Sequence, residues 1–440
     1  MLRNKHCAIV KKVHLEQKKF QAVVFVSLIA LTPLEAQAYL DPGTGSMLLS
    51  VLVGAVSSAY FLIRRLPGMV RAAYFRLAGK KDDLKGNGIV FYSEGRTYWS
   101  TFRPVLAALA ARKTHVTYLT SDEGDPVFQS GWDEYVKARF IGKGNAAYTA
   151  LGFLQADLFV LTTPGIDVLQ IKRSAGVRKY IHLVHAIGDI HTYKFYSFDY
   201  YDAVYCAVPG QIKSLRALEA SRQTKAKELR LLGCAYLDGL VERKQREGVR
   251  LEERTVLVAP TWGRNGLLSK TGARVPLQLE KAGYHVIVRP HPQSFISDKG
   301  VMQEVLEAIA GHEGIEVDRD PDGFKSLSRA AAMVSDISGV IFDYAFVFLR
   351  PVVSVGEGPI KDGYEAWELK HEAWEQGILS RIGEHVEAGE EDKLEAVLER
   401  VMERRGEYEE AIREIRDETV ENFGRAGEPI AQALLEEKAR

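Results

Sequence analysis

The sequence predicts an α/β fold with two Rossmann-like domains behind an N-terminal membrane segment. A chain of 440 residues is too long for one hydrophobic core. Short β-rich runs alternate with amphipathic stretches over most of its length, which is typical of doubly wound parallel sheets. Two apolar runs with basic flanks precede this pattern. Hydrophobic residues make up 46% and charged residues 26%, an ordinary globular composition that excludes disordered and fibrous classes.

The N-terminal part has the layout of a signal sequence followed by a membrane span. Lysines precede the apolar run Phe20–Leu34, and Ala36-Gln37-Ala38 supplies small residues suited to cleavage. A second apolar run, Met47–Ile63, ends at two arginines, and residues 64–85 are rich in Lys and Arg. Either the leader is cleaved and one span remains, or both runs form a hairpin. The positive-inside rule places the rest of the chain in the cytoplasm in both cases. The alternative is that Met47–Ile63 is a buried core helix.

Charge is distributed unevenly along the chain. Residues 1–85 carry 13 Lys/Arg and 5 Asp/Glu, whereas the remainder carries 45 and 53. A basic leader joined to an acidic body indicates contact with a lipid bilayer and not with nucleic acid. Cys7, Cys206 and Cys234 are far apart and form no metal-ligand spacing, which favours a reduced compartment.

The body contains two series of expected strands. The first series continues from its opening strand into a helix expected over residues 102–112, and a polar stretch at 242–254 separates the two series. The strands are expected at 88–92, 116–119, 158–161, 180–184 and 203–207, then at 255–259, 285–288, 332–334 and 352–355.

Three parts follow from this pattern. Residues 1–85 are expected to form the anchor and a basic linker, residues 86–245 an N-terminal Rossmann-like domain, and residues 246–440 a C-terminal Rossmann-like domain with C-terminal helices. The sequence from Glu384 onward has helical spacing and many charges, so it should form two or more surface helices.

Three strand ends of the second series carry polar motifs. They are Ala259-Pro260-Thr261-Trp262-Gly263, Arg289-Pro290-His291-Pro292 and Ser335-Asp336-Ile337-Ser338-Gly339. Ligands of open α/β sheets bind at the carboxyl ends of the strands, so the three motifs together predict a nucleotide site. The alternative for each motif alone is a structural turn or helix cap.

Each motif suggests a way to bind phosphate. Arg289 and His291 would supply cationic donors to a pyrophosphate. Ser335 or Asp336 would cap a helix that begins near Val340, and the free N–H groups of its first turn would bind an anion. Thr261, Ser338 and Gly339 complete the expected nucleotide-binding set.

The first series has its own candidate, His185, which follows the strand expected at 180–184. A histidine at a strand end suits general-base catalysis because its ordinary pKa lies near neutral pH. His191 is a second candidate, with Lys194 just beyond it, and His182 a third. The alternative is that His182 and His185 only pack and form hydrogen bonds.

Several other chemistries lack their motifs. The sequence contains no HExxH, no Gly-x-Ser-x-Gly, no Walker loop and no Asp-rich metal triad. These absences argue against hydrolase and kinase activity. We expect no metal and no tightly bound cofactor.

The Arg-Pro-His-Pro motif, the segment from Ser335 to Tyr344 and Ala259-Pro260-Thr261-Trp262 together resemble the CDP-glycerol glycerophosphotransferase family of teichoic-acid and capsule polymerases. The resemblance covers roughly residues 180–434. It implies a glycosyltransferase-B-like architecture and transfer of a polyol phosphate from a CDP-alcohol to an acceptor hydroxyl, with release of CMP. It also implies that His185 is the base and that His291 contacts the phosphates of the donor.

The resemblance implies a CDP-alcohol donor and a membrane-associated polyol or glycan acceptor. It also implies that residues 86–245 form the acceptor domain and residues 246–440 the nucleotide-donor domain. Ala186 follows His185 where the family usually has glycine. Two alternatives stay open. One is a nucleotide-sugar glycosyltransferase of the same fold. The other is a catalytically silent, membrane-tethered nucleotide-binding protein, which Ala186 favours.

Overall fold

A computed structural model describes residues 88–320, 323–336, 338–357 and 361–440. The chain divides into two units, Met1–Lys80 and Lys81–Arg440, and every described residue belongs to the second. Both apolar runs of the expected membrane segment lie outside the described residues. Among the helices that the structure does describe, none is long and apolar enough to cross a membrane.

The first sheet has seven parallel strands in the order β3-β2-β1-β4-β5-β6-β7. Parallel pairing requires a crossover between successive strands, which the intervening helices and loops supply. The strands are β1 (Ile89–Ser93), β2 (Val116–Thr120), β3 (Val136–Phe140), β4 (Ala156–Leu161), β5 (Val177–Leu183), β6 (Ala203–Cys206) and β7 (Glu228–Leu231).

The second sheet has six parallel strands in the order β10-β9-β8-β11-β12-β13. Its strands are β8 (Glu252–Val258), β9 (His285–Val288), β10 (Ile315–Val317), β11 (Ala330–Ser335), β12 (Val352–Val355) and β13 (Gly383–Val386). The two parallel sheets confirm the α/β class and the two Rossmann-like layers that the sequence predicts.

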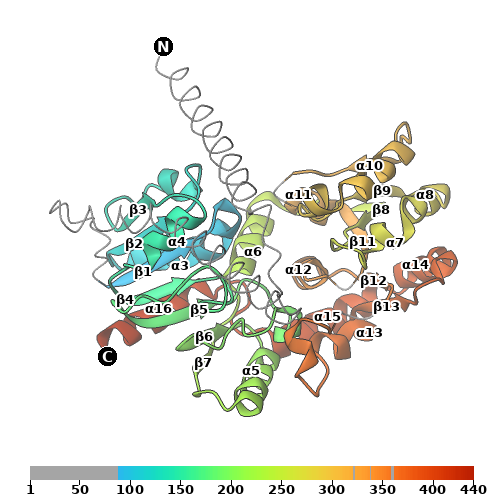
Figure 1. Cartoon of the computed structure of the whole chain (residues 1–440). Helices are drawn as coiled ribbons and strands as arrows, with labels where there is room; N and C mark the ends of the chain where they lie inside the picture. Colours follow the sequence, from blue (N-terminus) through green and yellow to red (C-terminus); the bar gives the residue numbers. More distant parts are fainter. Residues whose placement is uncertain (1–87, 321–322, 337, 358–360) are drawn as a thin grey trace, which may run out of the picture. The chain divides into compact units, whose positions relative to one another are not determined.

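Helices accompany both sheets (Figure 1). The α-helices are α3 (Trp99–Ala111), α4 (Asn145–Leu151), α5 (Pro209–Arg222), α6 (Ala235–Glu247), α7 (Leu267–Thr271), α8 (Arg274–Lys281), α9 (Ser294–Ser297), α10 (Lys299–Ala308), α11 (Phe324–Arg329), α12 (Val340–Phe348), α13 (Leu379–Ile382), α14 (Leu394–Glu403), α15 (Arg405–Thr419) and α16 (Gly427–Ala439). The 3-10 helices are η1 (Arg96–Tyr98), η2 (Pro126–Gln129), η3 (Ile190–Thr192), η4 (Glu365–Trp367), η5 (Trp374–Ile378) and η6 (Glu391–Lys393).

The first sheet is buried on both faces because its central strands are mostly apolar. In β1, Ile89 and Phe91 belong to one hydrophobic cluster, and Val90 and Tyr92 belong to another. Successive side chains of a strand point to opposite faces, so each cluster covers one face. The cluster that contains Val90 and Tyr92 also includes strand residues of the second sheet.

The C-terminal helix packs with the first sheet. Ile430 and Leu434 of α16 share a cluster with Phe102 of α3 and with strand residues of the first sheet. Figure 1 shows α16, in red, beside these elements. Surface helices are present after residue 384, as expected, but Glu384 itself lies in β13 and α16 is largely buried. Helix α16 therefore packs with the first sheet although it lies at the end of the sequence.

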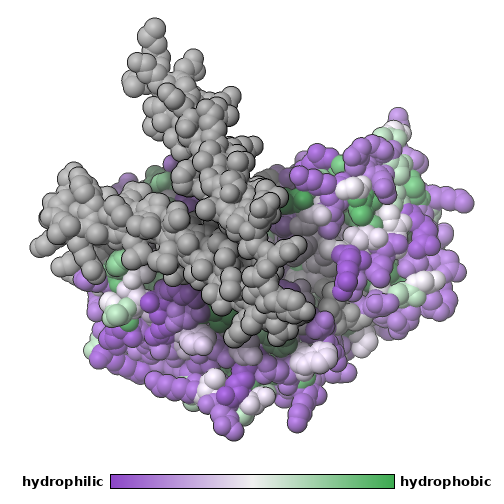
Figure 2. All heavy atoms as spheres, viewed as in Figure 1, coloured by the Kyte–Doolittle hydropathy of each residue, from purple (hydrophilic) through white to green (hydrophobic). Residues whose placement is uncertain are grey.

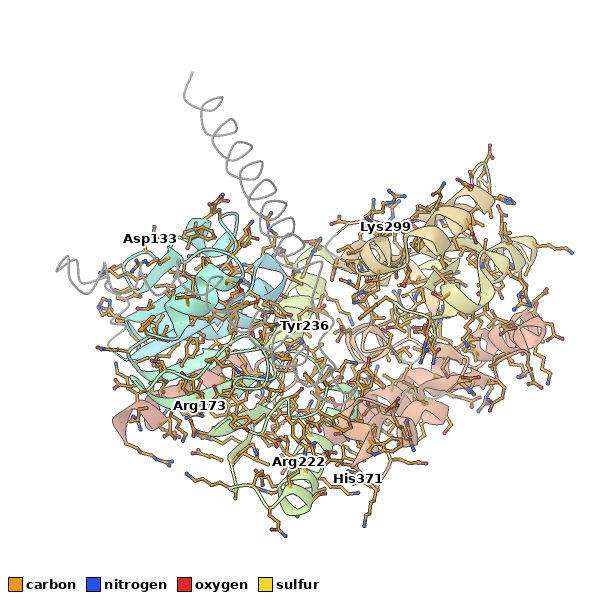
Figure 3. All side chains as sticks on the ribbon, viewed as in Figure 1. Asp133, Arg173, Arg222, Tyr236, Lys299 and His371 are labelled. Carbon is orange, nitrogen blue, oxygen red and sulfur yellow. The ribbon has the colours of Figure 1, made fainter. Side chains whose placement is uncertain are left out.

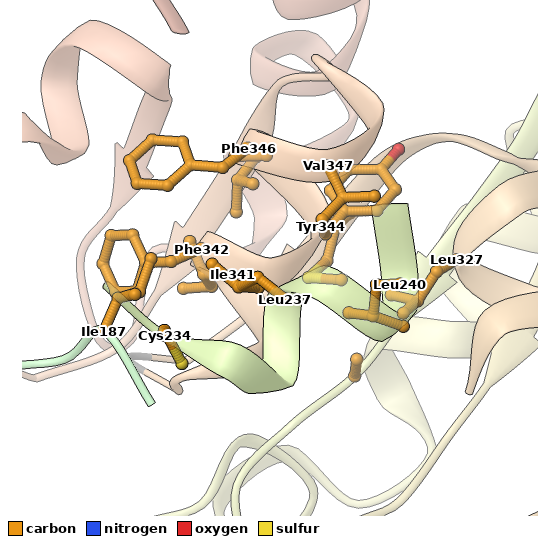
Figure 4. Close-up of a cluster of buried hydrophobic side chains, with 14 of the residues drawn as sticks. Ile187, Cys234, Leu237, Leu240, Leu327, Ile341, Phe342, Tyr344, Phe346 and Val347 are labelled. Carbon is orange, nitrogen blue, oxygen red and sulfur yellow. The ribbon is translucent and has the colours of Figure 1, made fainter. Parts of the chain in front are cut away.

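Helices α6 and α12 pack against each other through apolar side chains (Figure 4). Leu237 of α6 lies beside Ile341 of α12, and Leu240 lies on the side of Tyr344 and Leu327; all five are buried. Burying such side chains contributes about 1.5–3 kcal/mol each. This contact joins a helix that follows the first sheet to a helix of the second.

The visible surface of the described residues is mostly hydrophilic, with small apolar areas (Figure 2). Among the large apolar side chains of this part of the chain, Trp262 and Trp367 are well exposed, at 46% and 67%. Isolated exposed apolar residues are common, but a half-exposed tryptophan at a strand end can contact a ligand.

Candidate functional site

Both sheets have a point at which the strand order reverses. In the first sheet it lies between β1 and β4, and in the second between β8 and β11. Loops at the carboxyl ends of the two strands diverge there, which leaves room for a ligand. The sequence-predicted residues lie at or next to these two points.

His185 lies two residues beyond β5, at the carboxyl edge of the first sheet. The ring of Tyr98 meets it edge to face at 5.5 Å. The Nδ1 atom of His185 is buried and has no hydrogen-bond partner. Burial lowers the pKa of His185 to about 4, so the imidazole is neutral at pH 7. A neutral ring with an unpaired nitrogen is able to accept a proton.

The loop after His185 is fixed by a glutamine from α5. Gln211 Nε2 donates to the carbonyl oxygens of Ala186 at 3.1 Å and Gly188 at 2.8 Å. Its Oε1 accepts from the backbone N–H of Ala207 at 2.8 Å, which fixes the orientation of the amide. One buried side chain therefore satisfies two carbonyl groups next to the candidate base.

The same loop is held from the segment that follows β12. Trp374 Nε1 donates to the carbonyl oxygen of Ile187 at 3.0 Å, and the backbone N–H of Trp374 donates to Asp189 Oδ2 at 3.1 Å. The backbone N–H of Asp189 donates to both carboxylate oxygens of Glu375 at 3.1 Å. Burial, followed by the nearby Asp189 carboxylate, raises the pKa of Glu375 to about 7.

His191 is buried in this network. Its Nε2 lies 2.8 Å from the carbonyl oxygen of His371, and its Nδ1 lies 3.6 Å from Asp189 Oδ1. Burial alone would lower the pKa of His191, but Asp189 and the His371 carbonyl raise it above its ordinary value. His191 therefore joins two loops, and His371 is bound in turn to Ser214 of α5 at 3.0 Å.

His182 is fully buried within β5 among the rings of Phe198, Tyr201 and Tyr193. Neither of its ring nitrogens has a hydrogen-bond partner. Burial, with a smaller effect of His185, lowers its pKa well below the ordinary value. His182 is thus a neutral core residue with no access to a substrate.

Lys194 lies where the two loop segments pair. Its ammonium stands 3.7 Å above the ring centre of Tyr364, and the two residues form an isolated antiparallel bridge. Nearby, Arg222 at the end of α5 forms ion pairs with Asp199, Glu365 and Glu368. Figure 3 shows Arg222 and His371 in this region. Lys194 therefore packs against Tyr364, and none of these contacts places it as a catalytic base.

On the second sheet, Asp336 organises the loop that contains Thr261. Its Oδ1 accepts from the backbone N–H of Thr261 at 2.7 Å, and its Oδ2 accepts from that of Leu267 at 2.8 Å. Ser335 Oγ donates to the carbonyl oxygen of Ala259 at 2.7 Å. Both side chains shape the loop after β8 from the neighbouring strand end.

This arrangement corrects one expectation. Helix α12 begins at Val340 as predicted, but its N-cap is Gly339 and no side chain caps it. Ser335 and Asp336 do not cap the helix because their oxygens are bound to the loop after β8. Gly339 is exposed, and an added Cβ would meet no atom within 4 Å.

His291 is exposed at the carboxyl end of β9. Its Nδ1 accepts from the backbone N–H of Gln293 at 3.1 Å, so in the neutral ring the proton is on Nε2. Partial burial and the charge of Arg289 lower the pKa of His291, so it is a neutral donor and not the cation expected from the sequence. Its ring lies 6.4 Å from that of Trp262.

Arg289 is held by an acidic partner. Its Nη1 donates to Asp318 Oδ2 at 2.6 Å and to the carbonyl oxygen of Asp320 at 2.8 Å. Asp318 follows β10, so the ion pair connects the ends of two adjacent strands. Arg289 lies beside His291, and its role towards a pyrophosphate stays a prediction.

Comparison with known families decides the class. The family model described as CDP-glycerol:poly(glycerophosphate) glycerophosphotransferase matches residues 74–421, well over half of the chain. The chain belongs to this family. It is therefore an enzyme of the glycerophosphotransferase type, as the sequence motifs predict.

Solved structures show the same fold. A wall teichoic acid polymerase, TagF, is 16% identical and matches with a TM-score of 0.53 over 86% of this chain and 98% of that chain. UDP-GlcNAc 2-epimerase from Neisseria meningitidis is 14% identical, with a TM-score of 0.51 over 80% and 99%. These likenesses confirm the two-domain, glycosyltransferase-B-like architecture. No curated protein matches the chain in sequence.

This glycerophosphotransferase has Ala186 at the position where the family usually has glycine, and the structure explains why alanine fits there. Ala186 is not among the described residues with positive φ, so its backbone does not require glycine. Its carbonyl oxygen accepts the hydrogen bond from Gln211. Alanine is thus compatible with the loop that positions His185.

Two further residues lie near the second switch point: Asp343, which the sequence identified only as part of the segment from Ser335 to Tyr344, and Tyr236, which it did not identify. Burial raises the pKa of Asp343, in the first turn of α12, to about 7. Asp343 in turn is the main cause of the raised pKa of Tyr236, at the start of α6. Arg289 also acts on Tyr236, so the three side chains share one region. Strongly perturbed pKa values are typical of functional sites. Among the described residues, no group of acidic, His or Cys side chains forms a metal site.

Proposed function

We propose that this enzyme transfers glycerol phosphate from CDP-glycerol to an acceptor hydroxyl and releases CMP. The observation that carries the proposal is His185, a neutral histidine with an unpaired nitrogen in a loop fixed from α5 and from the segment after β12. The family match supports the donor class. The TagF structures, described as wall teichoic acid polymerases, support an acceptor that belongs to a cell-surface polymer.

The proposed reaction is a direct displacement at phosphorus. The acceptor oxygen forms a bond to the β-phosphorus of CDP-glycerol while the bond from that phosphorus to the bridging oxygen breaks. CMP leaves with the bonding electrons, and the hydroxyl proton passes to the imidazole of His185. An anionic phosphate beside the ring would raise the pKa of His185 towards the working pH, which favours this transfer.

The donor is proposed to bind at the second switch point. His291 would donate from Nε2 to a phosphate oxygen, and the exposed ring of Trp262 beside it offers an apolar face. Ser338 and Gly339 precede α12, whose first-turn N–H groups favour negative charge. Thr261, Ser335 and Asp336 would set the shape of the loop after β8, and Arg289 would add positive charge nearby.

The test compares donors and nucleotides with the full-length protein. CMP should be released from CDP-glycerol when a polyol phosphate or membrane-derived acceptor is present, and UDP-sugars should not be consumed. In isothermal titration, CDP should bind more tightly than UDP or GDP. CDP binding without release of CMP from any CDP-alcohol would favour a silent binding protein, and UDP-sugar consumption would favour a glycosyltransferase.

We also propose that residues 1–85 anchor the enzyme at the cell membrane with its catalytic body in the cytoplasm. The basic flank at 64–85 supports this orientation. An anchor would confine the enzyme to the surface on which a lipid-linked acceptor lies, while a soluble donor diffuses to it. A reporter fused after Arg440 should be active only in its cytoplasmic form, and activity outside the cell would refute the orientation.

A further inference from the structure

A polar pocket opens at the carboxyl end of β1, at the switch point of the first sheet. Its volume is about 500 Å³, within the range of small-molecule sites. Residues of three loops line it: Glu94 and Arg96 after β1, Ser121 and Asp122 after β2, and Lys143 after β3. None of these residues belongs to the proposed donor site on the second sheet.

The lining combines fixed positive charge with hydroxyl groups. Arg96 is oriented by two bonds to Asp122, from Nε at 2.6 Å and from Nη2 at 3.0 Å. Lys143 is exposed between Gly142 and Gly144, both at positive φ. Cations of this kind bind phosphate oxygens well.

Hydroxyl groups and a second carboxylate, in addition to that of Asp122, complete the pocket. The hydroxyl of Tyr92 is 2.9 Å from Ser121 Oγ, and the pair lies on the pocket wall with Tyr148. The exposed carboxylate of Glu94 also lines the pocket. A carboxylate accepts hydrogen bonds from hydroxyl groups but repels phosphate. The chemistry therefore fits a ligand with separate anionic and polyol parts.

The pocket is connected to the candidate base by the chain itself. Arg96 and Thr97 line the pocket, and Tyr98 of the same 3-10 helix contacts the ring of His185. Burial, and then the carboxylate of Glu94, raise the pKa of Tyr98. The loop after β1 thus links the pocket lining to the ring that contacts His185.

We propose that this pocket binds the polyol-phosphate end of the acceptor, with Arg96 and Lys143 on its phosphate and Glu94 on its hydroxyl groups. The proposal rests on the proposed function, because it assigns a site to the second substrate of that reaction. It places donor and acceptor at the switch points of different sheets. His185, which contacts Tyr98 of the 3-10 helix that begins at Arg96, then takes the proton from the hydroxyl that attacks.

The test uses Lys143→Ala, with Lys137→Ala as a matched control. Lys137 is exposed on β3 and does not line the pocket. A soluble oligo(glycerol phosphate) serves as acceptor and probe. Loss of one charged contact should raise its KM and its Kd about tenfold in Lys143→Ala. Affinity for CDP and the rate at saturating acceptor should stay unchanged. Lys137→Ala should behave as the unmodified protein in every assay.

A second variant separates the two halves of the ligand. Glu94→Gln should make glycerol a weaker competitor of oligo(glycerol phosphate) binding. Inorganic phosphate should compete equally well or better, because a negative charge is removed from the pocket. Unchanged oligomer affinity in Lys143→Ala would overturn the proposal, as would a loss of CDP affinity instead. Binding is measured by titration without turnover. If the unmodified protein bound the oligomer through Lys143 but released no CMP, the pocket would stand and the proposed reaction would fail.

Discussion

The indole N–H of Trp374 donates to the carbonyl oxygen of Ile187 at 3.0 Å, across 187 positions of the sequence. Ile187 is two residues beyond the candidate base His185. The backbone N–H of Trp374 adds a bond to Asp189. A segment that follows β12 of the second sheet therefore fixes the loop that carries the base on the first sheet.

Trp374→Phe should lower kcat for CMP release several-fold while the KM for CDP-glycerol changes little. The substitution keeps an aromatic ring next to Phe342 but removes the bond to Ile187. A less well-oriented base slows the chemical step without altering donor contacts. Loss of one neutral hydrogen bond should cost about 1 kcal/mol in the free energy of unfolding. Steady-state kinetics and denaturant unfolding measure the two effects.

Trp367→Phe is the control, because the Trp367 side chain is 67% exposed. It should leave kcat, KM and stability unchanged. If Trp374→Phe reduced stability but kept its kcat, the indole contact would be structural only, and the loop would not need it for catalysis.

His291→Ala should weaken CDP binding about ten- to a hundredfold, the usual effect of losing one hydrogen bond to a charged group. The fold should be unaffected because the side chain is exposed and its bond to Gln293 is local. Isothermal titration measures the change. His312→Ala, at another exposed histidine, is the control. Equal CDP affinity in both variants would mean that His291 is only a turn residue.

His182→Leu should make the protein less sensitive to acid. The folded protein keeps His182 neutral, whereas the unfolded chain takes up a proton near pH 6.5, so stability is lost as pH falls below that value. Below pH 6.5, the free energy of unfolding of the variant should therefore rise relative to that of the unmodified protein, by up to about 1.4 kcal/mol for each pH unit. Thermal unfolding between pH 7.5 and 5 tests this. If the difference in stability between the variant and the unmodified protein stayed constant over that pH range, His182 would not be buried in its neutral form.

The sequence predicted the interior strands of both sheets but missed β3, β7, β10 and β13. All four are edge strands. Interior strands are apolar at nearly every position because both faces are buried, which makes them visible in the sequence. The edge strands, such as Val-Lys-Ala-Arg-Phe in β3, mix charged and apolar residues and resemble loops or helix segments.

The site was predicted in part for similar reasons. Polar motifs at strand ends identified the loops around His185, His291 and Asp336. The contacts of Gln211, Trp374 and Glu375 with the His185 loop depend on residues distant in sequence, which no local pattern reveals. The pocket at Glu94 and Arg96 could have been predicted from the sequence. Ligands of open α/β sheets bind at the carboxyl ends of strands, and these two residues follow the first strand. The histidine of Arg-Pro-His-Pro was expected to be charged, but partial burial of its ring and the neighbouring arginine lower its pKa.

The central claim is that His185 is the base that activates the acceptor, and His185→Gln tests it most directly. Glutamine preserves bulk and hydrogen bonding but cannot accept a proton near neutral pH. CMP release from CDP-glycerol with acceptor should fall by about 10² to 10⁴, while CDP affinity stays nearly constant. In the unmodified enzyme, kcat/KM should fall as pH drops towards the pKa of His185, about 4 in the free protein. Normal turnover by the glutamine variant would contradict the account.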